Sequence, residues 1–305
     1  MINTALPIAQ QEALKELSAA QLRRLMFIEF RLWFYGQVRR KEVINRFGMA
    51  TAAGTRDLAL YVDLAPHNCR YERKSYVYDA AFQPLFTHQI ENVLDELTTG
   101  TGISEQQGQP IYTISHARPT RLSYPRLADL AAVTRAIYGQ YALRLHYYSI
   151  AEGLQEREIV PHAIVDSGIR WHARAFDRQH GDFRDLVLTR MKGVKQLTDT
   201  AQAQAHKKEC SAADVEWNRT VTLQLIPHPG QPHKESIKMD LNMQGDCLQI
   251  EVSAAMAGYY LRQWLVDCST NARLNYPEYR LYLANREVLA DVRNAVLAPG
   301  YIDDK

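Results

Sequence analysis

Hydrophobic positions in the first quarter of the chain recur at the spacing of amphipathic helices. From Ser18 onward, apolar side chains follow every three or four residues across 22–34, and a serine in this place is a good N-cap. A short stretch of the same kind spans 39–47, and after a turn at Gly48 a third spans 50–62. The pattern therefore predicts three helices in close succession.

After the third helix the pattern changes to alternation. Aromatic and β-branched residues alternate with charged ones across 69–78, which is typical of a half-exposed β-hairpin. A further amphipathic helix is predicted over 84–97, whereas the first dozen residues carry a weak pattern and are expected to be frayed. Helix, short helix, glycine turn, helix and hairpin follow one another in the order of a winged helix-turn-helix.

The rest of the chain mixes helices and strands. A helix over 125–138 precedes apolar runs separated by glycines, which predict a small barrel or sandwich with strands over 142–149, 157–165, 170–176 and 184–190. The polar stretch 202–213 is interpreted as a linker. The final hundred residues predict strands over 220–226, 237–243, 247–252 and 280–283, and helices over 254–265 and 286–297.

Length and these changes of pattern together set the expected domain organisation. A chain of 305 residues has room for two or three domains. We expect an α+β protein with domains over 1–97, 125–200 and 201–305. The stretch 98–124 is expected to be a linker, because it begins with few apolar residues.

Composition excludes several classes of protein. No apolar run approaches the roughly 20 residues of a membrane span. The most apolar early run is interrupted by Glu29 and Arg31, and no small-residue cleavage site follows it, so we expect a cytoplasmic protein without a signal peptide. The four cysteines are widely spaced, without a CxxC pair, and are expected to be reduced thiols.

No arrangement of residues predicts catalysis. The motifs HExxH, GxSxG and GxxxxGK[ST] are absent from the sequence. His228 and His233 flank a Pro/Gly turn without further ligands nearby, and a surface loop is a better interpretation than a metal site. We therefore expect neither an enzyme nor a bound metal or cofactor.

The charge of the chain is unevenly distributed. The net charge is +2, from 36 basic and 34 acidic residues. The span 36–78 holds eight basic and four acidic residues, a local excess of +4, so the remainder sums to −2. A positive surface of this kind favours DNA, because contacts with phosphates release counterions and supply most of the nonspecific affinity.

The third predicted helix carries the residues best placed to read DNA. Its buried face is expected to hold Gly54, Leu58, Tyr61 and Val62. Small side chains beside that face would let the helix enter the major groove, where Thr55 and Arg56 reach base edges or phosphates. The alternative is a helical subdomain whose arginines are merely solvated. The predicted DNA-binding set comprises basic and small residues of two helices and the hairpin: Arg39, Arg40, Lys41, Thr51, Ala52, Thr55, Arg56, Arg70, Arg73 and Lys74.

The middle domain carries a second pattern. Its strands contain Tyr-Tyr-Ser over 147–149, Arg-Glu-Ile-Val-Pro over 157–161 and Arg-Trp-His-Ala-Arg-Ala-Phe over 170–176, and a closing strand runs from Arg184 to Arg190. This resembles the WYL domain of bacterial transcription regulators, an SH3-like or Sm-like small β-barrel. The name-giving Trp-Tyr-Leu triplet departs from the family here, since the tryptophan is followed by His and Ala.

The resemblance also implies an effector site. Its matching positions are Tyr147, Ser149, His172, Arg174, Arg184 and Arg190. Alternation along the third strand adds Arg170, which shares a face with His172 and Arg174. Arginines, a histidine and an aromatic ring suit a phosphate plus a base. The alternative is an ordinary solvent-exposed sheet face, on which Arg174 pairs with Asp177 or Asp185.

The resemblance extends toward both ends of the chain. The Phe-Gly-Met of 47–49, the Arg-Asp-Leu of 56–58 and the hairpin resemble the winged helix of WYL repressors associated with phage-defence loci, the BrxR/CapW-like group. In that group a C-terminal α+β extension takes part in homodimerisation, and 205–305 is similar in size and composition.

Several properties follow from this resemblance as expectations. It implies a homodimeric repressor that binds a palindromic double-stranded DNA operator at its own promoter and controls a phage-defence operon. A small anionic or nucleotide-like effector would control DNA affinity, and no membrane partner is expected. The alternative is a nucleic-acid- or ligand-binding accessory protein without specific operator binding.

Overall fold

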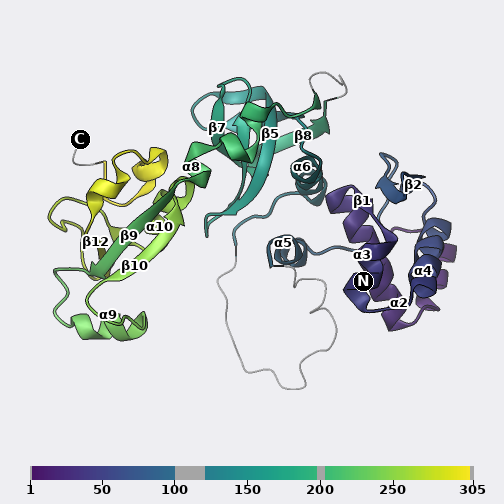
Figure 1. Cartoon of the computed structure of the whole chain (residues 1–305), viewed down its shortest axis with the longest axis horizontal. Helices are drawn as coiled ribbons and strands as arrows, with labels where there is room; N and C mark the ends of the chain where they lie inside the picture. The colour runs from purple at the N-terminus through teal and green to yellow at the C-terminus, as the bar shows by residue number, and fades with distance from the viewer. Residues whose placement is uncertain (1, 100–120, 198–202, 303–305) are drawn as a thin grey trace. The chain divides into compact units, whose positions relative to one another are not determined.

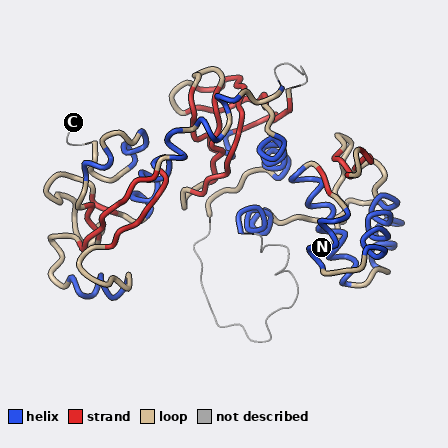
Figure 2. Tube along the Cα trace, viewed as in Figure 1, coloured by secondary structure: helices blue, strands red, loops and turns tan. Residues whose placement is uncertain are grey.

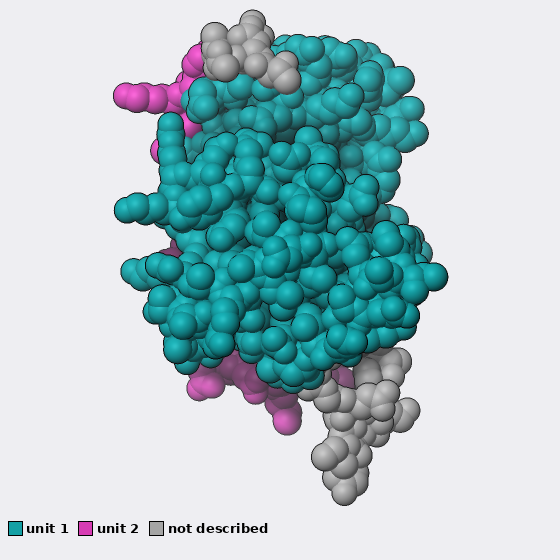
Figure 3. Space-filling view, turned by 90° about the vertical axis from the view of Figure 1, so that its right-hand side faces the viewer, with its two compact units in different colours: residues 1–164, 173–205 teal, residues 165–172, 206–305 magenta. Residues whose placement is uncertain are grey.

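The computed structural model describes residues 2–99, 121–197 and 203–302, so most of the predicted linker over 98–124 lies outside the described residues. The chain divides into two compact units, coloured separately in Figure 3. Unit 1 comprises 1–164 and 173–205, and unit 2 comprises 165–172 and 206–305. The predicted winged helix and most of the predicted WYL domain therefore belong to one compact body.

Two helices and a π-helical segment open unit 1 (Figure 1): α1 spans Ile8–Lys15, α2 spans Ala19–Phe30 and η1 spans Arg31–Tyr35. As predicted, Ser18 caps α2, and its hydroxyl accepts the Gln21 N–H at 3.3 Å. The expectation of a frayed start over the first dozen residues is wrong, because α1 begins at Ile8 and Leu6 is buried in the same core as α2.

The predicted pair of helices and the hairpin are present: α3 spans Arg40–Phe47, α4 spans Thr51–Leu64, β2 spans Cys69–Glu72 and β3 spans Ser75–Tyr78. A strand that the sequence did not reveal, β1 (Gln37–Val38), completes a sheet of order β1-β3-β2. Gly48 ends α3 at φ 60°, a left-handed conformation that glycine adopts readily. The turn at this glycine sets the start of α4.

A buried carboxylate fixes the chain that follows the hairpin. Glu29 of α2 is fully buried and accepts the N–H groups of Leu85 and Phe86 at 2.7 and 3.1 Å. The Leu85 carbonyl in turn accepts the Asn3 N–H at 2.9 Å and is thereby withheld from a helix. The helix predicted from residue 84 consequently starts late, and α5 spans Ile90–Thr99.

The second part of unit 1 consists of a helix and a sheet, and Figure 2 shows the strands gathered beside the helix. The helix α6 spans Leu127–Gly139, and the sheet has the order β7-β6-β5-β4-β8. Its strands are β4 (Leu143–Ser149), β5 (Gly153–Asp166), β6 (Trp171–Asp177), β7 (Asp182–Val187) and β8 (Met191–Gln196). The four predicted strands are present, but the last gives way to a 3-10 turn over Leu188–Arg190 that leads into the unpredicted β8.

Unit 2 is built on a four-stranded sheet of order β10-β9-β12-β11. Its elements are α8 (Val215–Asn218), β9 (Thr220–Pro227), α9 (Lys234–Asp240), β10 (Leu248–Ser253), α10 (Ala254–Gln263), β11 (Val266–Asp267) and β12 (Leu281–Leu283). Buried side chains of β9, α10 and β12 form its core, among them Leu223, Leu261 and Leu283. The predicted α+β character is confirmed.

Two elements of unit 2 differ from the sequence prediction. The strand predicted over 237–243 is largely the helix α9, in which Lys238 pairs with Glu235 at 2.6 Å across one helical turn. The helix predicted over 286–297 is two separate 3-10 turns. The second turn is held against α10 because the Asn294 side chain accepts the Gly258 N–H at 3.0 Å. The second predicted linker also contains 3-10 turns, over Lys207–Glu209 and Ser211–Ala213.

The prediction of a surface loop is wrong for one histidine. His228 is 2% exposed, and its Nε2 lies 3.1 Å from a carboxylate oxygen of the fully buried Asp267. Because His228 Nδ1 accepts the Gly230 N–H at 3.1 Å, the proton lies on Nε2 and points to Asp267. No group of three or more potential metal ligands occurs among the described residues. None of the described helices combines the length and apolar character needed to span a membrane.

Candidate nucleic-acid interface

The ends of α3 and α4 and the hairpin enclose a groove with a volume of about 770 Å³, called here the α3–α4 groove. All ten residues predicted to bind DNA are exposed. Six of them line this groove: Arg39, Arg40, Lys41, Thr51, Thr55 and Lys74. The remaining lining residues are Ile44, Leu58, Tyr71 and Tyr76. The groove thus joins cations from the helix and the hairpin, and no carboxylate lines it.

Local hydrogen bonds fix the start of α3 against its neighbours. The Glu42 carboxylate accepts the Arg39 N–H at 2.7 Å and caps the first turn. The Arg39 side chain donates from Nε to the Ser75 hydroxyl of β3 at 3.0 Å. The Arg40 guanidinium donates to the Thr55 hydroxyl of α4 at 3.3 Å. Two of the predicted arginines therefore bridge the elements that form the groove.

One face of α4 is exposed and carries predicted DNA-binding residues, and the other face packs against the core. Thr51, Ala52, Thr55 and Arg56 are exposed, and Arg56 has no hydrogen bond or ion pair within the described ranges. The buried face holds Gly54, Asp57, Leu58 and Tyr61, as predicted except for Asp57, while Val62 is half-buried. A Cβ on Gly54 would lie 3.0 Å from the Ile44 side chain, so glycine allows the close approach of α3 and α4.

Asp57 was not predicted to be buried because its partner is distant in sequence. Its carboxylate accepts the Arg24 Nε–H of α2 at 2.5 Å, and the Asp57 side chain is 6% exposed. This ion pair ties α4 to α2 directly beneath the exposed face of α4. Nothing in the local pattern of charges distinguishes Asp57 from the exposed Asp63, six residues later on the same helix.

The tip of the hairpin presents two cations on an unusual backbone. Arg73 and Lys74 have φ values of 45° and 66° and connect β2 directly to β3. Such a two-residue turn usually holds Asn-Gly, because other L-residues are strained at positive φ. Both side chains are exposed, and neither has an ion pair within the described part of the chain. Strain retained at an exposed basic tip is typical of a functional site.

The structure places Arg70 apart from the other predicted DNA-binding residues. Alternation along β2 and β3 turns Tyr71 and Tyr76 toward the α3–α4 groove, and Arg70 and Val77 to the opposite side. Arg70 also pairs with Glu72 at 2.5 Å and Asp79 at 3.4 Å. The hydrogen bond that Arg70 donates to the Glu72 carboxylate raises the pKa of Arg70.

The seven predicted effector residues are not on one exposed face. Arg170 and His172 belong to unit 2, where the buried His172 ring lies 5.4 Å from the Tyr259 ring of α10. The other five belong to unit 1: Tyr147, Ser149, Arg174, Arg184 and Arg190. Of these five, Arg184 alone is exposed.

Hydrogen bonds hold several of the effector residues of unit 1. The Tyr147 hydroxyl accepts the Val187 N–H at 3.1 Å, and Ser149 accepts the Glu152 N–H at 3.3 Å in the β4–β5 turn. Arg174 is buried and pairs with Asp185 at 3.3 Å. The alternative interpretation of β6 as a solvent-exposed face is wrong, because all seven of its residues are buried. The same interpretation correctly named Asp185 as a possible partner of Arg174.

A buried ionic cluster beside Tyr147 was missed from the sequence. Arg157 of β5 binds the carboxylates of Asp177 and Glu152, and its side chain is 2% exposed. His180 Nδ1 lies 2.9 Å from Asp177, and the Arg157 guanidinium lies 5.5 Å from the centre of the Tyr147 ring. Asp177 is thus the partner of Arg157 and not of Arg174. The Arg-x-x-x-Pro pattern was the only signal for Arg157 in the sequence.

Comparison with known proteins divides the chain into three matched regions. The model of the BrxR transcriptional regulator winged helix-turn-helix domain matches 20–99, the WYL domain matches 128–196, and the BrxR transcriptional regulator C-terminal dimerization domain matches 220–289.

Similar proteins come from several bacteria. The DNA-binding transcriptional repressor CapW of Pseudomonas aeruginosa is 30% identical over 286 residues, which are 89% of this chain and 91% of that protein. The CapW repressor of Escherichia coli (strain KTE188) is 30% identical over 80% of this chain and 82% of its own length. That of Stenotrophomonas maltophilia is 31% identical over 79% and 82%.

Proposed function

Because this chain belongs to the BrxR/CapW family of winged-helix, WYL-domain transcriptional regulators, a family without enzymatic activity, we propose that it represses transcription by binding a DNA operator through the α3–α4 groove. The observation that carries the proposal is the lining of this groove. Four cations from α3 and the hairpin face it without a carboxylate among its lining residues, beside the exposed Thr55 and Arg56 of α4. Phosphate contacts would position the domain, and the exposed face of α4 would read base edges.

The test measures two quantities: the preference for one DNA sequence over another, and the electrostatic contribution to the binding affinity. Purified full-length protein is titrated with duplex DNA from upstream of its own gene and with a scrambled duplex of the same composition, at several salt concentrations. We expect tighter binding of the upstream DNA. Lys41→Ala/Lys74→Ala should reduce the slope of log affinity against log salt by about 0.9 for each phosphate that the protein no longer neutralises.

A matched control keeps the change of charge but moves it off the groove. Lys15 of α1 and Arg23 of α2 are exposed cations that do not line the α3–α4 groove, and Lys15→Ala/Arg23→Ala should leave the slope nearly unchanged. Equal affinity for both duplexes would contradict specific repression and would favour the accessory-protein alternative. Equal reductions of the slope by both variants would show that the groove is not the interface.

Dimerisation and a palindromic operator belong to the same proposal. The match of 220–289 to a dimerization domain supports a homodimer, and two-fold symmetry would place two α4 helices on two half-sites. The expected mass in solution is twice that of the 34.9 kDa chain. A monomer that binds a single half-site as tightly as the whole operator would contradict this arrangement.

We further propose that an effector controls DNA binding and that the regulated genes belong to a phage-defence operon. A nucleotide-like anion bound by the predicted WYL residues would change operator affinity, and Arg184, the exposed member of the set, is the residue to change first. Deletion of the gene should raise transcription of the neighbouring defence genes, as expected of a cytoplasmic repressor. Unchanged transcript levels would contradict the regulatory link and leave the DNA-binding test unaffected.

A further inference from the structure

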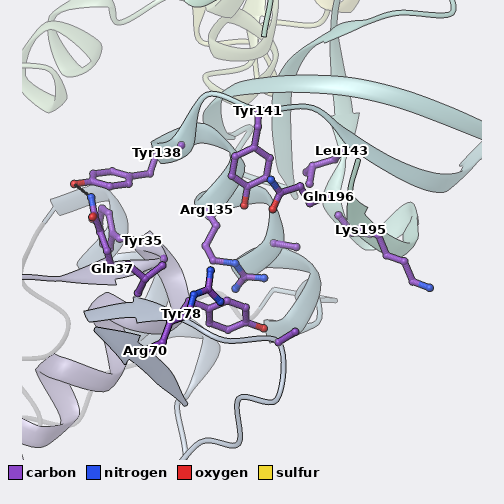
Figure 4. Close-up of a pocket in the computed structure, with 16 residues that line it drawn as sticks. Tyr35, Gln37, Arg70, Tyr78, Arg135, Tyr138, Tyr141, Leu143, Lys195 and Gln196 are labelled. Carbon is purple, nitrogen blue, oxygen red and sulfur yellow. Dashed lines mark hydrogen bonds between the residues drawn. The ribbon is translucent and has the colours of Figure 1, made fainter. Parts of the chain in front are cut away.

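A second hollow lies on the other side of the hairpin within unit 1. It has a volume of about 600 Å³ and is called here the rear pocket (Figure 4). Its walls come from β1, β3, α6 and β8, so it adjoins both the winged helix and the WYL sheet. None of the seven predicted effector residues lines it. Its size is within the range of pockets that bind small molecules.

The joint around the rear pocket is held by packed and hydrogen-bonded side chains. Arg135 of α6 donates to the Trp33 carbonyl at 2.6 Å, and its guanidinium lies 4.1 Å from the centre of the Tyr78 ring. The Tyr35 and Tyr138 rings pack edge to face at 5.4 Å. These contacts fix the walls of the pocket before any ligand enters.

Glycine shapes the end of α6 where it meets the pocket. A Cβ on Gly139 would lie 2.7 Å from the Tyr141 ring, closer than any side chain allows. The absence of a side chain therefore lets Tyr141 fold back against the helix end and face the pocket, as Figure 4 shows. Burial raises the pKa of Tyr141, so its hydroxyl keeps its proton at neutral pH.

The chemistry of the lining selects one class of ligand. Three cations line the rear pocket, namely Arg70, Arg135 and Lys195, together with four tyrosines and no carboxylate. Figure 4 shows Arg70 and Arg135 beside Tyr78, on the same side of the pocket. Guanidinium groups bind phosphate through charge-assisted hydrogen bonds, and tyrosine rings offer stacking surfaces to a base. Arg70 keeps donors for a ligand, since a guanidinium has five N–H groups and Arg70 uses two in its ion pairs.

We propose that the rear pocket binds a nucleotide-class ligand, with its phosphate on Arg70 and Arg135 and its base against the tyrosines. The hairpin is the wall between this pocket and the α3–α4 groove, because two neighbouring residues of β3 face opposite sides: Tyr76 lines the groove and Val77 lines the pocket. A bound ligand therefore acts on the strand that carries one side of the groove. This effect on DNA affinity rests on the proposed function, whereas ligand binding itself does not.

The binding test uses full-length protein and calorimetric titration with AMP, GMP, CMP and UMP, and with adenosine and inorganic phosphate as fragments. We expect saturable binding of at least one nucleotide with a dissociation constant below about 1 mM, and weaker binding of either fragment. Arg70→Ala should weaken the binding by about tenfold or more, since it removes a charged hydrogen-bond donor. No saturable binding of any of the four nucleotides, or phosphate alone binding as tightly, would overturn the proposal.

Three further variants locate the site. Arg73→Ala removes a cation of the same hairpin that does not line the rear pocket, and should leave nucleotide affinity unchanged. Arg135→Lys keeps a charge but loses the planar fork, and should weaken binding in a protein that still folds. Arg184→Ala distinguishes the rear pocket from the predicted WYL set, because Arg184 belongs to that set and does not line the pocket. An equal loss from Arg73→Ala, or a loss from Arg184→Ala without one from Arg70→Ala, would overturn the assignment to the rear pocket.

Hydrogen exchange tests the effect on the hairpin without DNA. Saturating nucleotide should slow amide exchange in β3 and leave α9 of unit 2 unchanged. Unchanged exchange in β3 would contradict the coupling through the hairpin. If the nucleotide binds as predicted but the protein does not bind its upstream DNA, the proposed function fails and the ligand site remains.

Discussion

The basic residues of unit 1 occupy opposite environments in its two parts. In the winged helix the predicted DNA-binding cations are exposed, and the described residues show no ion pair for Lys41, Arg56, Arg73 or Lys74. In the WYL sheet Arg157 and Arg174 are buried, and each is paired with a carboxylate. An exposed cation can exchange water for phosphate at a small cost in free energy, whereas a buried arginine is already paired with a carboxylate. The same residue type thus serves binding in one part and internal order in the other.

This difference bears on the expected effector site. A ligand phosphate at Arg174 would have to displace Asp185 from a pair whose side chains are 7% and 11% exposed. Breaking a buried pair by removing one partner is strongly destabilising. Exposed cations such as Arg184, and Arg70 and Lys195 of the rear pocket, do not carry this penalty. The predicted set therefore divides into residues that can contact a ligand directly and residues that hold the sheet.

Arg157→Met should produce the largest change, because it leaves the buried Asp177 carboxylate without its guanidinium partner. We expect the free energy of unfolding to fall by about 3–5 kcal/mol. Urea denaturation followed by circular dichroism measures it. The control Arg144→Met alters a half-exposed cation of β4 and should barely move the midpoint. Similar midpoints for both variants would remove the contrast between buried and exposed arginines.

Asp57→Ala tests the packed side of the winged helix. The change leaves Arg24 without its carboxylate and loosens α4 from α2. We expect a decrease of about 2 kcal/mol in the free energy of unfolding. Asp63→Ala, at an exposed position of the same helix, is the matched control and should have little effect. A decrease as large from Asp63→Ala would show that the charge of the helix matters and not the ion pair.

Arg56→Ala, at the position next to Asp57, should change DNA affinity and not stability. The residue is exposed on α4, so the stability of the protein should not change measurably. Operator affinity should fall by about 1–3 kcal/mol if Arg56 reads a base edge, and binding of all DNA should weaken alike if it contacts phosphate. Titration with matched and scrambled duplexes distinguishes these outcomes. Unchanged affinity for both would exclude Arg56 from the interface.

Local patterns were enough to predict the winged helix. Ser18, Gly48 and the helical spacing specify elements through neighbours in the sequence, and the structure confirms α2, α3 and α4. The exposed positions of all ten predicted DNA-binding residues followed from helix and hairpin periodicity. What the pattern could not supply was Asp57, whose burial depends on Arg24, 33 residues away.

The WYL sheet was predictable in its strands but not in its ion pairs. Alternation placed Arg174 on a face, yet whether that face meets solvent depends on elements that are distant along the chain. Arg157 and Asp177 are 20 residues apart and meet only when β5 and β6 lie side by side. The rear pocket has the same origin, since its lining comes from segments more than a hundred residues apart. Such sites need the tertiary structure.

Arg70→Ala should have the smallest effect on operator affinity. It tests whether DNA contacts only the side of the hairpin that faces the α3–α4 groove. Arg70 lines the rear pocket and is held by Glu72 and Asp79, whereas Lys74 lines the α3–α4 groove. We expect operator affinity without nucleotide to change by less than twofold, compared with a clear reduction from Lys74→Ala in the same titration. A reduction from Arg70→Ala that matches Lys74→Ala would mean that DNA contacts both sides of the hairpin. In that case the side of the hairpin to which a cation points would not determine which ligand it binds.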